Sequence, residues 1–165
     1  KIGLGSAVGT TAHMVFDEAG AILKPLTPAF MAIAAGQTNV TGDDTEYTVL
    51  FASSERFDQG GNFASPTFTA PVTGKYYLTA SVGISGGSSS ITYTNMYITT
   101  SNYRYDWFSG AGGNFGEGGS FKPSFSIIAD MDASDTAVVK ISVGGMGSDS
   151  LDVTDNSFFG GYLMC

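Results

Sequence analysis

One segment, from Tyr76 to Ser85, alternates apolar and polar side chains with a period of two residues. Successive side chains of an extended strand point to opposite faces, so this pattern predicts a strand with one face in a core. A shorter run begins at Phe68, and Pro71 and Gly74 separate the two runs. Proline cannot donate a ladder hydrogen bond and glycine tolerates positive φ, so the chain has to turn here between two strands.

Similar short runs recur from Phe30 to the end of the chain. Clusters of Gly, Asn, Asp and Ser separate them, and such clusters form turns and surface loops. No segment keeps a helical period over the roughly 11 residues that a convincing helix needs. About eight or nine strands without a helix predict an all-β fold, either a two-sheet sandwich of the jelly-roll type or a barrel. The pattern alone does not separate these two architectures.

Residues 1–28 lack this dense alternation, and Pro25 and Pro28 stiffen their end. The fragments IGLG and HMVFDEAGAI predict short strands there, and so small a pair is marginal by itself. We therefore expect a shaft-like β segment and connector in residues 1–28 and one head domain in residues 29–165. The chain begins at Lys1 without a methionine or a signal-peptide pattern, so we expect it to be the C-terminal piece of a longer protein.

The net charge limits the class of partner, and the cysteine content limits how the fold can be stabilised. Fifteen acidic and seven basic residues give a net charge of −8, which repels nucleic acid and anionic membrane surfaces. No apolar run approaches the roughly 20 residues of a membrane span, so membrane insertion is not expected. Cys165 is the single cysteine and allows no internal disulfide, so stability has to come from packing or from assembly.

Four landmarks follow one another along the head: FD at Phe57, then FTAPVTGKYYL, ADMDASDTAVVKISV and the terminal FFGGYLM. Their order resembles the globular-head family of complement component one q, which shares its jelly roll with tumour necrosis factor. Ser134 stands where that family usually has Gly, and Gly160 where it often has Ser. The resemblance covers about residues 28–165 and implies a two-sheet antiparallel jelly-roll sandwich. The positions that match the family's aromatic, Pro and Gly-x-Tyr stretch are Phe68, Pro71, Gly74 and Tyr76.

A second resemblance concerns the amino-acid sequences of these segments. TFTAPVTGKYYL, TTSNYRY and ADMDASDTA look like domains at the C-termini of structural proteins of tailed bacteriophages. The upstream IGLG and HMVF fragments resemble shaft segments of phage fibres. The resemblance implies a virion protein of a fibre or tail appendage, whose shaft contacts other virion proteins.

Members of the complement family form homotrimers, and the sequence offers a physical reason for one here. Aromatic side chains on both faces of the last strand would leave apolar surface exposed in a monomer, and a threefold assembly would cover it. The candidates for the trimer interface are Tyr77, Phe158, Phe159 and Tyr162.

Catalytic chemistry finds little support. His13 is the only histidine and lies in the predicted shaft, far from any nucleophile of the head. We therefore expect no enzyme and no required cofactor. Asp130, Asp132 and Asp135 supply oxygen donors like the start of a calcium loop, but Gly and Glu are missing at the positions that a helix-loop-helix site requires. These carboxylates are either turn residues or an opportunistic calcium site.

The segment YRYDWFSGAGGNF is the strongest binding candidate. Its aromatic side chains could stack on sugar rings beside a Gly-rich loop, with polar contacts from its charged residues. Alternation would send Tyr103, Tyr105 and Trp107 to one face of a strand, where they could instead fill the sandwich or the trimer interface. The receptor-binding candidates are Tyr103, Arg104, Tyr105, Asp106, Trp107, Asn114 and Phe115.

Together these patterns predict a non-enzymatic, trimeric jelly-roll head at the tip of a phage fibre or tail appendage, located on the virion. It would bind a receptor on the bacterial surface, a glycan or a protein, through loops at its distal face. Two alternatives remain open at this stage. The head could be a structural cap that only trimerises, or the chain could be a secreted bacterial adhesion module.

Overall fold

A computed structural model describes residues 14–16, 18–110 and 119–165 of the chain. All regular elements in these residues are β-strands, and every strand pair is antiparallel. The described part of the chain contains no helix of the length and apolarity that a membrane crossing requires. The predicted all-β class is confirmed.

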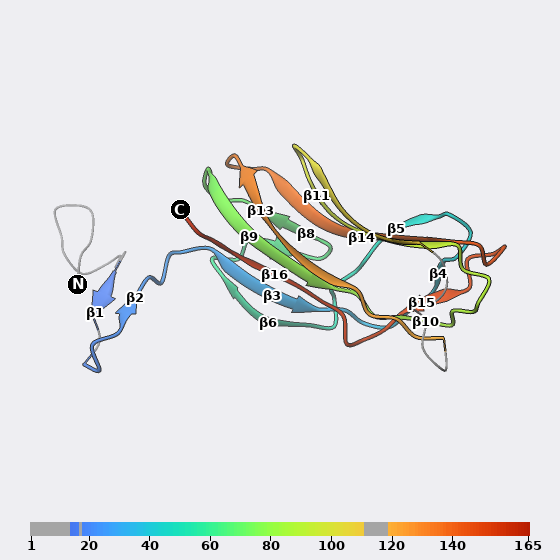
Figure 1. Cartoon of the computed structure of the whole chain (residues 1–165). Coiled ribbons are helices and arrows are strands. Elements are labelled where there is room, and N and C mark those ends of the chain that lie inside the picture. The colour runs from blue at the N-terminus through green and yellow to red at the C-terminus, as the bar shows by residue number, and fades with distance from the viewer. Residues whose placement is uncertain (1–13, 17, 111–118) are drawn as a thin grey trace.

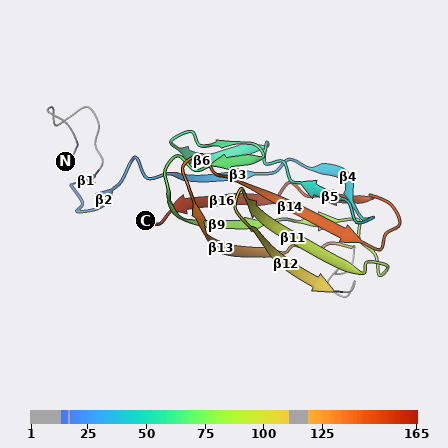
Figure 2. The same ribbon diagram turned by 90° about the horizontal axis from the view of Figure 1, so that it is seen from above.

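Two sheets pack face to face as a sandwich, with their long strands along the long axis of the head (Figures 1 and 2). The first, which we call the five-stranded sheet, has the strand order β13-β9-β16-β3-β6. Its strands are β3 (Ala29–Ile33), β6 (Ser54–Gln59), β9 (Gly74–Ser81), β13 (Ser124–Met131) and β16 (Phe158–Leu163).

The second layer, which we call the six-stranded sheet, has the order β12-β11-β14-β8-β7, with β5 also paired to β14. Its strands are β5 (Glu46–Thr48), β7 (Phe63–Ala64), β8 (Thr67–Thr69), β11 (Tyr93–Thr100), β12 (Arg104–Gly110) and β14 (Thr136–Gly144). The two-sheet antiparallel sandwich agrees with the jelly roll that the sequence resemblance implies.

Two small sheets lie at opposite ends of the molecule (Figure 1). The pair β1 (Val15–Phe16) and β2 (Ile22–Leu23) precedes the head. The head's near end is the one at which the C-terminus lies, where Leu163 donates its N–H to Pro28 O. A sheet of β4 (Gln37–Thr41), β10 (Ile84–Ser85) and β15 (Leu151–Val153) marks the opposite, far end. β3 begins at Ala29, the first residue of the predicted head.

Aromatic side chains fill the centre of the sandwich. Phe30 stacks on Phe68 with 4.5 Å between ring centroids, and the edge of Phe159 meets it at 5.0 Å. These rings come from the middle of β3, β8 and β16, which belong to both sheets. Full burial of each such side chain contributes about 1.5–3 kcal/mol, so this cluster holds the two layers together.

The turn predicted at Pro71 and Gly74 joins the two sheets. β8 ends at Thr69 in the six-stranded sheet, and β9 begins at Gly74 in the five-stranded one. The buried Tyr76 donates its hydroxyl to Val72 O at 2.7 Å, which ties the turn to the strand that follows. A Cβ at Gly74 would lie 2.5 Å from Cys165 O, so only glycine lets the C-terminal residues pass this close. The Gly-x-Tyr pattern of the sequence therefore has a structural cause.

Four strands of the head were not predicted from the sequence. β4 and β15 lie in segments whose Gly, Asn, Asp and Ser residues predict loops, and β6 and β7 were not expected as strands. Conversely, the apolar run YTVLFAS (residues 47–53) predicts one strand, but it forms a strand only at its start, since β5 ends at Thr48. The sequence patterns of β4 and β6 are dominated by polar residues, because both strands keep much of their surface in solvent.

Candidate functional site

The outer surface of the five-stranded sheet is apolar. Strand register places Ile128, Tyr77 and Tyr162 in one row across the sheet. The next row contains Met31 of β3, which pairs with Phe57 of the neighbouring strand β6. We call this surface, with Phe158 in the third row, the apolar face. Three of its side chains are about half exposed, namely Phe57 (50%), Ile128 (56%) and Tyr162 (47%).

A groove of about 320 Å³ crosses the middle of the apolar face. Gly160 lies between Thr79 and Met31 in the middle row, so no side chain fills the space between the flanking rows. The rings of Tyr77 and Tyr162 border the groove with 5.4 Å between their centroids. Tyr77 donates its hydroxyl to Ser126 Oγ at 2.8 Å, so its polar atom is satisfied within the sheet. The groove therefore offers an apolar, preformed contact surface.

The structure brings together three of the four predicted trimer-interface residues. Tyr77, Phe158 and Tyr162 line the groove of the apolar face. The assignment of Phe159 to an interface is wrong, because its side chain is fully buried in the core against Phe30 and Phe51. Successive side chains of a strand point to opposite faces, so Phe158 and Phe159 cannot serve the same surface.

The outer surface of the six-stranded sheet carries ion pairs, and Phe108 is its one large apolar side chain that is more than half exposed among the described residues. Glu46 accepts from Arg104 at 2.7 Å and from Lys140 at 2.8 Å, and the Arg104 guanidinium lies 3.4 Å from the centre of the Tyr97 ring. We call Glu46, Tyr97, Arg104 and Lys140 the polar face. The hydrogen bond from Lys140 and the two positive charges hold the pKa of Glu46 below its ordinary value of 4.5. These ion pairs are partly exposed and need no partner to be satisfied.

The structure divides the predicted receptor-binding segment between two surfaces. As the alternation predicts, Tyr105 and Trp107 face one side of β12 and Arg104 and Asp106 the other. Tyr105 and Trp107 pack against the core, and Arg104 belongs to the polar face. The segment therefore does not form one stacking platform. Tyr103 stays 64% exposed, whereas the predicted contacts Asn114 and Phe115 lie outside the described residues.

Asp130 and Asp135, two of the three carboxylates considered for calcium, have different partners within the chain. Asp130 pairs with Lys75 at 2.7 Å, on neighbouring strands. Asp135 accepts the Asp132 N–H at 2.8 Å and a second hydrogen bond from Asn102, so it stabilises the turn before β14. Within the described residues no three His, Cys, Asp or Glu side chains are grouped as metal ligands. The turn interpretation fits these contacts, and an opportunistic calcium site at these carboxylates stays a prediction.

A near-end pocket of about 360 Å³ combines two of the predicted features. It is lined by Asn102, Tyr103, Tyr105, Asp130 and Asp132. The rings of Tyr103, just before β12, and Tyr105, within it, meet edge to face with 4.9 Å between their centroids. Asp130 lies at the end of β13, and Asp132 follows that strand directly. Acidic and aromatic side chains thus meet at the near end, beside the turn that carries Asp135.

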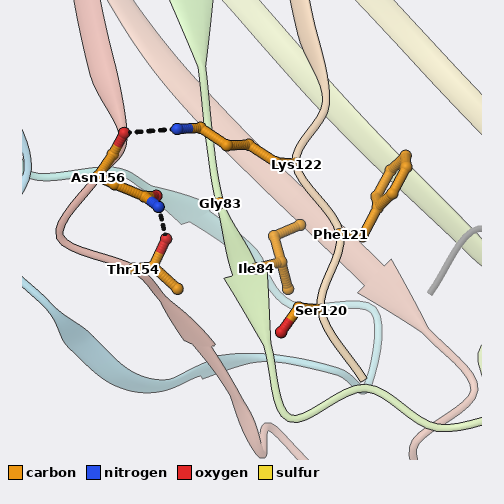
Figure 3. A pocket seen from close by; sticks show the side chains of 7 residues that line it. All are labelled: Gly83, Ile84, Ser120, Phe121, Lys122, Thr154 and Asn156. Atoms are coloured by element: carbon orange, nitrogen blue, oxygen red, sulfur yellow. Dashed lines mark hydrogen bonds between the residues drawn. The ribbon is translucent and has the colours of Figure 1, made fainter. Parts of the chain in front are cut away.

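A far-end pocket of about 220 Å³ lies where three segments meet (Figure 3). The segments contribute Gly83 and Ile84, then Ser120 to Lys122, then Thr154 and Asn156. Lys122 Nζ donates to Asn156 O at 2.8 Å, and Thr154 Oγ1 donates to Asn156 Oδ1 at 2.7 Å. We call this site the far-end pocket. The Gly- and Ser-rich segment that begins at Gly83 indicates a loop in the sequence, whereas no sequence pattern indicates a site at the segments that carry Lys122 and Asn156.

A close approach of backbone and side chain builds this pocket. A Cβ at Gly83 would lie 2.0 Å from Thr154 Oγ1, so glycine is required for the two segments to meet. Ile84 and Phe121 exchange both backbone hydrogen bonds, at 2.7 and 2.9 Å. The Phe121 ring also packs beside Trp107 with 5.6 Å between the ring centroids, which joins the pocket to β12. The residues are far apart in the sequence, and no spacing motif marks them.

Comparisons with known proteins support the fold. No family model and no curated protein matches the sequence. Among solved structures, the globular domain of the zebrafish complement 1qA protein aligns with a TM-score of 0.58 and 16% identity, over 84% of this chain and 98% of that one. A crystal structure of murine APRIL aligns with a TM-score of 0.59 and 12% identity, over 84% and 99%. The head therefore has the complement one q and tumour necrosis factor-like jelly-roll fold.

Proposed function

We propose that this chain is the non-enzymatic, homotrimeric head of a bacteriophage fibre or tail appendage, carried on the virion, and that it binds a glycan receptor on the bacterial surface. The observation that carries the proposal is the apolar face with its central groove. Exposed apolar patches of this kind mark interaction sites. The phage assignment rests on the sequence resemblance of the head segments and of the upstream shaft.

The partner that best fits the apolar face is a second copy of the same chain. The resembled family forms trimers, and in a cyclic trimer each subunit presents one surface to one neighbour and a different surface to the other. The near end carries both the C-terminus and the connector from the shaft. A trimer axis along the head would therefore present the three far ends to a cell surface, where three weak sites act together.

Sedimentation velocity of the full chain tests the assembly. We expect one species with three times the mass of the chain at micromolar concentration. A stable monomer in dilute buffer would contradict the proposed trimer.

Attachment to host cells tests the receptor role. The assembled chain should bind intact host bacteria and compete with phage adsorption. An assembled trimer that binds no host cell would instead support the structural cap, in which the head only ends a fibre. Degradation of a surface polysaccharide by the purified chain would contradict the non-enzymatic assignment.

A further inference from the structure

We infer that the far-end pocket binds a sugar unit that carries an anionic oxygen group, a carboxylate or a phosphate. This inference rests on the proposed function, because it names the chemical class of the receptor group.

The pocket has unused donors. The ammonium group of Lys122 has three N–H donors and spends one on Asn156 O. Ser120 Oγ and Asn156 Nδ2 make no hydrogen bond within the described residues. Figure 3 shows Lys122, Thr154 and Asn156 together at one side of the pocket. A ligand here can therefore receive hydrogen bonds from several protein groups.

Several acceptors of the pocket, by contrast, already receive a hydrogen bond. Gly83 O accepts the Thr154 N–H at 2.9 Å, and Ile84 O accepts the Phe121 N–H at 2.9 Å. Asn156 accepts with its backbone oxygen from Lys122 and with its side-chain oxygen from Thr154. The hydroxyls of Ser120 and Thr154 can still accept, whereas the ammonium of Lys122 and the amide nitrogen of Asn156 can only donate. The balance therefore favours a ligand that supplies acceptor oxygens.

Charge points to an anion. Among the described residues, Lys75, Arg104 and Lys140 each pair with a carboxylate, whereas Lys24, Arg56 and Lys122 do not. Lys122 differs from the other two because it lines a pocket, where it contacts a neutral carbonyl, and none of the described residues that line this pocket is acidic. In a chain with a net charge of −8, most of the surface repels anions. The far-end pocket is a place where an anionic group gains a charge-assisted hydrogen bond.

Size and walls fit one sugar unit. The volume of about 220 Å³ is below the roughly 300–1,000 Å³ typical of pockets for drug-sized ligands. Ile84 and Phe121 supply apolar groups on one side, with Ser120 next to Ile84, and the polar groups of Thr154, Asn156 and Lys122 lie on the other side (Figure 3). One apolar wall with polar groups opposite suits a sugar ring that carries one charged substituent.

Titration of the full chain with three small sugars at one ionic strength tests the inference. The probes are glucuronate, glucose 6-phosphate and glucose, followed by NMR chemical shifts. At least one of the two anions should bind about tenfold or more tightly than glucose, as expected for a charge-assisted hydrogen bond. Binding of both identifies the shared charge as the determinant, and binding of one identifies a carboxylated or a phosphorylated source. Equal binding of all three, or of none, overturns the inference.

Variants locate the site. Lys122→Gln should weaken anion binding about tenfold or more, Lys122→Arg should retain most of it, and the matched control Lys75→Gln at the near end should leave it unchanged. An unchanged urea midpoint for Lys122→Gln shows that the fold is intact. Anion binding that survives Lys122→Gln overturns the inference. A trimer that attaches to host cells but binds neither anion also overturns it and leaves the proposed function in place.

Discussion

The outer faces of the two sheets have the same architecture and opposite chemistry. On the six-stranded sheet, Arg104 and Lys140 both pair with Glu46, so the charged groups satisfy one another in water. On the five-stranded sheet, apolar rings border a groove in which Gly160 leaves a hollow. A surface of ion pairs gains little from being covered, because its charges would lose their hydration. An apolar surface with a preformed groove gains from every contact that excludes water. The five-stranded sheet is therefore the face that we expect the neighbouring subunit of the proposed trimer to cover.

A charge placed on the apolar face should have the largest effect on assembly. Tyr162→Asp removes a ring that makes no hydrogen bond within the described chain. It places a carboxylate in each of the three contacts, and burial of an unpaired ion costs several kcal/mol. We expect the trimer to dissociate to monomers at micromolar concentration, as measured by sedimentation velocity.

The matched control for this variant is Phe108→Asp. Phe108 is 61% exposed on the outer surface of the six-stranded sheet, against 47% for Tyr162. The control should remain trimeric. If both variants dissociate, or if only the control does, the assignment of the covered face is wrong.

Substitutions at two neighbouring residues of β16 distinguish an effect on folding from an effect on assembly. Phe159→Ala empties the core between Phe30 and Phe51, and such a truncation costs about 3–5 kcal/mol of the free energy of unfolding. Phe158→Ala removes a ring from the apolar face and should destabilise through the trimer contact alone. Urea unfolding at several protein concentrations distinguishes the two. The extra loss for Phe158→Ala should shrink as the protein is diluted, and the loss for Phe159→Ala should persist.

The alternation of the sequence predicted the inner, core-facing side of β9 well. Tyr76, Leu78 and Ala80 are buried as predicted, because a strand with one face in the core needs a period of two. Phe159 was misplaced, since periodicity says that Phe158 and Phe159 oppose each other but not which of them faces the core. Only the partner strands β3 and β9 decide that.

The functional sites were harder to predict than the core. β4 and β15 pair across more than 100 residues of sequence, as in the hydrogen bond from Asn39 N to Asp152 Oδ1. The far-end pocket likewise combines Gly83, Lys122 and Asn156, which no local pattern connects. A strand with a polar sequence and a pocket built from three loops depend on long-range pairing. Local propensity carries no signal of either.

Removal of one hydrogen bond on the apolar face tests whether the trimer contact depends on the ring of Tyr77 or on its hydroxyl. Tyr77→Phe keeps the ring at the groove and removes the hydroxyl that donates to Ser126. The trimer should form as before, and the free energy of unfolding should fall by about 1 kcal/mol, the usual net value of one hydrogen bond. Sedimentation and urea unfolding measure the two effects. Dissociation of this variant would mean that the contact depends on the hydroxyl rather than on the apolar ring.

The smallest effect should come from the polar face. Glu46→Gln removes the carboxylate shared by Arg104 and Lys140, and because the three side chains are partly exposed the loss at pH 7 should stay below about 1 kcal/mol. The folded-state pKa of Glu46 lies below its ordinary value of 4.5, so the ion pairs stabilise the protein above pH 4.5. This contribution is lost as the pH falls through the folded-state pKa, where Glu46 becomes protonated. Urea midpoints of the two proteins should therefore differ at pH 7 and converge in acid. A constant difference across this range would show that Glu46 acts through packing rather than through charge.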